Sequence, residues 1–171
     1  MPRLFFALWP DEEVRARLAV ALESLPPSTG RPVPLCNLHI TLAFLGDINE
    51  EQQMSMRAGA ATIQAPAFDL VFSHLGCWPH AAVAWLAPEN VPLALVELMA
   101  QLQSQCRDIG LKPDTRPYHP HLTIARKVRV VRHVDIAPIH WQIRGFSLME
   151  SARGRTGSEY RALGHWPLIS S

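Results

Sequence analysis

One short motif occurs twice in this chain, each time within an apolar run of the kind that forms a β-strand. The first copy is His39-Ile40-Thr41-Leu42 and the second is His121-Leu122-Thr123-Ile124. Successive side chains of a strand point to opposite faces, so the histidine and threonine of each copy share one face while the aliphatic residues point into a core. The two copies therefore predict two strands that each present an imidazole beside a hydroxyl.

Further strands and helices are expected on both sides of each motif. Helices are expected from Pro10 to Pro26, from Asn49 to about residue 63, and from Pro92 to Gly110. Strand-like patterns cover residues 3–8, 38–45, 68–72, 81–86, 121–125, 139–149 and 160–168. The motifs fall at similar points of two half-chains. We therefore expect one domain, residues 1–171, made of two similar lobes that face each other across a cleft.

The composition limits the class of protein. With 171 residues, 48% of them hydrophobic, the chain is long enough for a folded core and too apolar to be disordered. A net charge of +1 excludes a strongly basic surface, so a nucleic-acid partner must be held locally, at an end or at a few phosphates. No segment approaches the roughly 20 apolar residues that span a bilayer. We expect a cytoplasmic monomer without a membrane partner.

The three cysteines, Cys36, Cys77 and Cys106, are widely spaced and form no Cys-x-x-Cys pair. We expect reduced, mostly buried thiols. No cluster of histidine, carboxylate or cysteine side chains has the spacing of metal ligands, so no metal is expected.

The paired histidines suit acid–base chemistry on a phosphate. The ordinary pKa of histidine is about 6.5, so it can donate or accept a proton near neutral pH. A lone histidine in a strand is usually a packing or surface residue, but two matching His-x-Thr motifs favour a function. The other histidines lack the threonine partner and are expected at the surface or in packing: His74, His80, His133, His140 and His165.

The motifs and their surroundings resemble a known family, the two-histidine (2H) phosphoesterases. Within it, the chain is similar to the RNA 2′,3′-cyclic phosphodiesterases, historically called 2′-5′ RNA ligases. The similar stretches span nearly the whole chain and comprise residues 3–8, 37–46, 116–126 and 151–156, together with Tyr160.

The resemblance implies an α+β fold of two lobes, in which two antiparallel sheets face each other across a central cleft and the helices lie outside. It also implies hydrolysis of a terminal 2′,3′-cyclic phosphate of RNA to a 2′-phosphate, without a metal or other cofactor. In this family the first-motif histidine is the proton donor and the second the acceptor, which assigns these roles to His39 and His121. The reverse reaction is 2′-5′ ligation to a 5′-hydroxyl. The residues themselves do not show which of the two histidines donates the proton and which accepts it.

Other side chains are candidates for holding the substrate. Thr41 and Thr123 are expected to hydrogen-bond the phosphate oxygens, although threonine is also simply a good strand former. Arg126 is the nearest cation to the second motif and suits charge neutralisation. The alternative for Arg126 is a solvated arginine at a strand end, continuous with Lys127, Arg129 and Arg132.

For several residues near the motifs, the sequence gives less support for a functional role. His119 has the same strand parity as His121, and we assign it a supporting or structural role. Single-stranded RNA is often bound by stacking on aromatic rings, for which Phe44, Trp78 and Tyr118 are candidates, although packing is the more ordinary role of each. Arg153 and Arg155 either contact backbone phosphates or lie in a solvated turn.

Two other functions are compatible with these features. One is a phosphoesterase of the same superfamily that acts on another cyclic or 2′-5′ linked nucleotide, such as a cyclic ADP-ribose phosphate or a 2′-5′ oligonucleotide. The other is a module that binds RNA ends without turnover. Binding alone does not call for two titratable groups near neutral pH, which favours an enzyme.

Overall fold

The computed structural model describes residues 3–25, 30–129, 134–155 and 157–170. In chain order its elements are β1 (Arg3–Leu8), α1 (Glu12–Glu23), β2 (Arg31–Pro32), a 3₁₀ turn (Leu35–Asn37), β3 (Ile40–Asp47), α2 (Glu50–Ala60), β4 (Phe68–Trp78), β5 (Val83–Pro88), α3 (Leu93–Asp108), β6 (Leu122–Arg126), β7 (Val134–Ile143), β8 (Gly145–Arg153) and β9 (Ser158–Pro167). The Arg132, His133 and Thr156 positions considered above lie outside the described residues.

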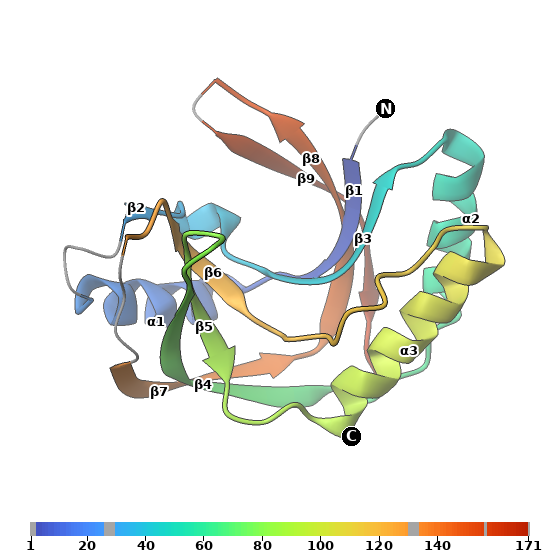
Figure 1. Ribbon diagram of the computed structural model, residues 1–171. Helices are drawn as coiled ribbons and strands as arrows, with labels where there is room; N and C mark the ends of the chain where they lie inside the picture. The colour runs from blue at the N-terminus through green and yellow to red at the C-terminus, as the bar shows by residue number, and fades with distance from the viewer. Residues whose placement is uncertain (1–2, 26–29, 130–133, 156, 171) are drawn as a thin grey trace.

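The strands form one curled antiparallel sheet made of two halves (Figure 1). One half has the order β7-β4-β5-β6, with β2 beside β6, and the other has the order β3-β1-β8-β9. The halves join where β3 pairs with β6, at the single register pair Ile40–Leu122. The expected α+β fold with antiparallel sheets around a cleft is confirmed, and the two sheets prove to be joined at this seam. The division of residues 1–171 into two similar lobes stays a prediction.

The β1 strand shows how the sequence assigns its side chains to two faces. Leu4, Phe6 and Leu8 belong to the main hydrophobic core. The alternating residues Phe5 and Ala7 belong to a second, smaller cluster on the opposite face. This alternation is the period of two expected for a strand that is covered on both sides.

The first two helices begin at polar capping residues. The Asp11 carboxylate accepts a hydrogen bond from the Val14 backbone N–H at the start of α1. Asn49 and Gln52 form a reciprocal capping box at the start of α2. Helices α2 and α3 pack against each other, with α3 also against β3, while α1 packs against β7 (Figure 1). The helices thus cover the outside of the sheet and leave its concave side open.

Two expectations about local structure were wrong. The single strand expected over residues 139–149 is two strands, β7 and β8, separated at Arg144. β7 pairs with β4 and β8 pairs with β1, so the chain crosses here from one half of the sheet to the other, and an apolar run carries no sign of a change of partner. The cysteines also differ from expectation, because only Cys106 is buried and Cys36 is exposed.

Two phenylalanines on the paired strands β1 and β3 provide a matched test of the core. Phe6 is fully buried against Phe146, whereas the Phe44 side chain is 77% exposed. We expect Phe6→Ala to lower the free energy of unfolding by about 3–5 kcal/mol, since it leaves a cavity. Phe44→Ala should change it by less than about 1 kcal/mol. Urea denaturation followed by circular dichroism measures both, and equal losses would contradict this assignment of the core.

Candidate active site

The two motifs meet at the seam between the halves of the sheet. Ile40 and Leu122 are both fully buried and pair with each other in antiparallel register. Each of these residues directly follows a motif histidine. Extending the register by one residue sets His39 opposite Thr123 and Thr41 opposite His121. All four side chains therefore belong to the concave face, arranged about an approximate twofold axis.

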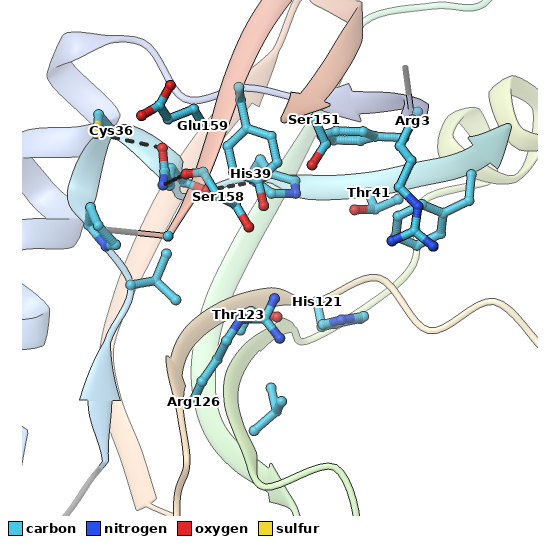
Figure 2. Close-up of a pocket in the computed structure, with 18 of the residues that line it drawn as sticks. Arg3, Cys36, His39, Thr41, His121, Thr123, Arg126, Ser151, Ser158 and Glu159 are labelled. Atoms are coloured by element: carbon cyan, nitrogen blue, oxygen red, sulfur yellow. Dashed lines mark hydrogen bonds between the residues drawn. The ribbon is translucent and has the colours of Figure 1, made fainter. Parts of the chain in front are cut away.

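A cleft of about 1250 Å³ opens over this seam. Its lining includes the five residues singled out from the sequence: His39, Thr41, His121, Thr123 and Arg126. His39 and Thr41 lie on one wall, and His121, Thr123 and Arg126 lie on the wall that faces it (Figure 2). The structure thus brings together residues that are far apart in the sequence.

Both imidazoles are oriented by the same backbone contact. The Nδ1–H of His39 donates to the Asn37 carbonyl oxygen at 2.7 Å, and the Nδ1–H of His121 donates to the His119 carbonyl oxygen at 2.7 Å. A carbonyl oxygen can only accept, so Nδ1 carries a hydrogen in both rings. Nε2 is then the nitrogen of each ring that can gain or lose a proton.

The surroundings of both histidines disfavour their charged forms. Burial is the largest influence that lowers the pKa of His39 below 6.5, opposed by the hydrogen bond to Asn37, and the charges of Arg126 and His121 lower it further. Burial likewise lowers the pKa of His121, with additional lowering by His119 and Arg126. Without a bound anion, the site therefore favours neutral imidazoles.

Arg126 reaches the cleft because β6 contains an irregularity. Strict alternation would place Arg126 on the opposite face from His121 and Thr123. Against β5, however, the register shifts from Ala84–Ala125 to Trp85–Thr123, which is the pattern of a β-bulge. The bulge reverses the alternation, so Arg126 lines the cleft beside both motifs. Its guanidinium adds a fixed positive charge where an anion would sit.

The aromatic surroundings of the two histidines differ. The His39 ring is stacked on Trp9, with centroids 4.9 Å apart and an interplanar angle of 2°. Phe5 and Tyr160 also contact it, at 5.2 Å and 5.1 Å. His121 makes an edge contact with Trp78 at 4.4 Å and 76°. We did not expect a role for Trp9, although its parity with Phe5 and Ala7 could have indicated that it packs with them on the side of His39.

The neighbours considered from the sequence have different positions in the structure. His119 supplies its backbone carbonyl to His121, while its side chain is exposed and does not line the cleft. The Tyr118 hydroxyl donates to the Thr41 carbonyl oxygen at 3.1 Å, which ties the loop before the second motif to the first motif strand. Phe44 and Trp78 line the cleft, whereas Arg153 and Arg155 do not.

The charge of the cleft is mainly positive. Its lining contains four cationic side chains and one carboxylate, namely Arg3, Arg31, Arg126, Lys127 and Glu159. Among the described residues, no group of three or more His, Cys, Asp or Glu side chains is placed to hold a metal ion. In the same part of the chain, no helix is both long and apolar enough to cross a membrane.

Known proteins share this fold and much of this sequence. A protein of Escherichia coli K12 named RNA 2′,3′-cyclic phosphodiesterase is 33% identical over 169 residues, covering 97% of this chain and 96% of that protein. A protein of the same name from Thermus thermophilus is 30% identical over 174 residues, covering 94% of this chain and 87% of that protein.

The crystal structure of E. coli LigT complexed with 3′-AMP matches the fold with a TM-score of 0.89, at 33% identity, over 98% of this chain and 99% of that one. The family model of the 2′-5′ RNA ligase superfamily matches residues 10–155. These matches confirm the resemblance seen in the motifs: the chain belongs to the 2′-5′ RNA ligase superfamily.

Proposed function

We propose that this protein is an RNA 2′,3′-cyclic phosphodiesterase that opens a terminal cyclic phosphate to a 2′-phosphate. The observation that carries the proposal is the pair of histidines on facing walls of one cationic cleft, each with Nδ1 bound to a backbone carbonyl and Nε2 left for proton transfer. The activity named for the relatives supports the same reaction.

In the proposed reaction, the cyclic phosphate lies between the two imidazoles. Neutral His121 takes a proton from water through Nε2, and the water oxygen forms a bond to phosphorus. Protonated His39 gives the proton on its Nε2 to the departing 3′ oxygen as the phosphorus–oxygen bond breaks. The product carries a 2′-phosphate and a 3′-hydroxyl, and the two histidines have exchanged protonation states. The reverse path joins a cyclic end to a 5′-hydroxyl as a 2′-5′ linkage.

The remaining predicted residues hold the phosphate in this arrangement. Thr41 and Thr123 donate hydroxyl hydrogen bonds to the non-bridging oxygens from opposite walls. Arg126 neutralises the negative charge that grows on those oxygens in the transition state. Phe44 is the most exposed of the three candidate aromatic residues, and its ring is available to stack on a base of the RNA.

We further propose that the protein works as a monomer in the cytoplasm. Both motif strands come from one chain, so a complete set of proposed catalytic groups needs no second copy. The reaction requires no cofactor in this scheme, since the two imidazoles perform both proton transfers.

An assay with a short RNA that ends in a 2′,3′-cyclic phosphate tests the function. We expect the purified protein to release a 2′-phosphate end in the presence of EDTA, because histidines and not a metal ion move the protons. The products are separated by chromatography against 2′- and 3′-phosphate standards. Tight binding without product would contradict the enzyme and favour an RNA-end-binding module, and loss of activity in EDTA would contradict the metal-independent mechanism.

Single histidine variants test the proposed roles. We expect His39→Ala and His121→Ala each to lower kcat by about 100-fold or more, the usual contribution of a positioned acid or base. His140→Ala is the matched control, since His140 is exposed on β7 and should leave kcat unchanged. Near-normal turnover by either motif variant would remove that histidine from the mechanism.

The pH dependence follows from the lowered histidine pKa values. His121 must be neutral, so activity falls as the pH drops below its pKa; His39 must be protonated, so activity falls as the pH rises above its pKa. Both pKa values lie below 6.5 in the free protein, so kcat/KM should peak below pH 6.5.

The bound phosphate favours both imidazolium forms and raises both pKa values, so kcat should peak at higher pH than kcat/KM. Initial rates in constant-ionic-strength buffers measure the two profiles. A kcat maximum at lower pH than the kcat/KM maximum would contradict binding of the phosphate between the histidines.

A further inference from the structure

A small aromatic cluster, separate from the main core, lies beside the cleft, which its members Phe5 and Tyr160 line. Phe5, Ala7 and Met149 are buried in it, and Trp9 and Tyr160 are packed against them. Its rings surround one motif histidine, His39, through stacked, tilted and edge contacts. The cluster thus forms the aromatic surroundings of His39.

Among these rings, Trp9 differs in its orientation relative to the His39 imidazole. Its ring is parallel to the imidazole within 2°, whereas Phe5 is tilted by 40° and Tyr160 meets the imidazole edge-on at 69°. The face of an indole carries partial negative charge and attracts a cation within about 6 Å of its centre. At 4.9 Å, the Trp9 face lies within this range of the His39 ring. The parallel contact also restricts rotation of the imidazole out of its plane.

His39 needs such support if it is to carry a proton. From the second motif segment, Arg126 and His121 oppose its positive charge, and burial opposes it more strongly. The Asn37 carbonyl before β3 favours the charged form. Further ionisable groups line the cleft on this side: Arg3 on β1, Cys36 in the 3₁₀ turn before β3, and Glu159 and Tyr160 on β9. Trp9 is therefore placed to offset part of an otherwise unfavourable environment.

We propose that Trp9 is a positioning residue, whose indole face fixes the plane of the His39 ring and stabilises its imidazolium form, so that His39 can act as the proton donor. The assignment of a donor rests on the proposed function. The stabilisation itself is a property of the protein without substrate, and it can be measured independently of turnover.

The His39 pKa in Trp9→Leu separates this role from simple packing. If Trp9 only buries the imidazole, the smaller leucine admits water and the His39 pKa rises or stays the same. If the indole face stabilises the cation, the pKa falls, and the usual strength of such contacts corresponds to a drop of about 0.4–0.7 in pKa. NMR titration of the imidazole resonances in the substrate-free protein measures the shift.

Two further variants complete the experiment. Trp9→Phe keeps a smaller aromatic face, so it should lower the His39 pKa by less than leucine does, and it provides the test if the leucine variant fails to fold. Trp78→Leu is the matched control, because Trp78 contacts His121, and it should shift the His39 pKa less than Trp9→Leu does. A rise or no change in the His39 pKa on replacing Trp9 would overturn the inference.

Kinetics distinguish this inference from the proposed function. On the alkaline side of the profile, Trp9→Leu should lower kcat by about 2- to 5-fold through the loss of protonated His39, with KM little changed. If the wild-type protein does not hydrolyse the cyclic phosphate but the NMR shift has the expected sign, the proposed function fails and the stabilisation of His39 by Trp9 stands. If hydrolysis is normal and the sign is opposite, only the inference about Trp9 fails.

Discussion

The pairing of Ile40 with Leu122 is the contact on which the site depends. It joins the two halves of the sheet at a single register position, and both side chains are fully buried. Because a motif histidine directly precedes each partner, this one pair fixes the relation between His39 and His121. The strands separate beyond the seam, which leaves space for a substrate between the facing motifs. A shift of one residue on either strand would turn one imidazole into the core.

The site combines symmetric orientation with asymmetric surroundings. In both imidazoles, Nδ1–H donates a hydrogen bond to the backbone carbonyl oxygen two residues earlier, so both present Nε2 for proton transfer. Their ring contacts differ, because the His39 ring stacks on Trp9, whereas the His121 ring makes an edge contact with Trp78. Acid–base catalysis requires opposite protonation states in two identical groups, and unequal surroundings are a physical means of producing them. In the proposed reaction, these unequal surroundings are a physical basis for giving the two histidines different roles.

The sequence predicted the parts of the site that follow from local alternation. His39 and Thr41 share a face because they are two residues apart in a strand, and the same reasoning holds for the second motif. Arg126 was selected by proximity, but its entry into the cleft depends on the bulge in β6, which alternation cannot predict. Trp9 was missed because its importance comes from contact with His39, thirty residues away in the chain. The break at Arg144 was missed because it reflects a change of partner strand.

The central claim is that both imidazoles act on a single phosphate. The most direct test is an NMR titration of protein labelled with ¹⁵N in its histidines, using a nucleoside 2′-monophosphate as the product-like ligand. We predict that the Nε2 resonances of His39 and His121 shift together with one common Kd, at one ligand per chain, and that both pKa values rise. A response from only one of the two histidines, or two different Kd values, would contradict a shared phosphate site.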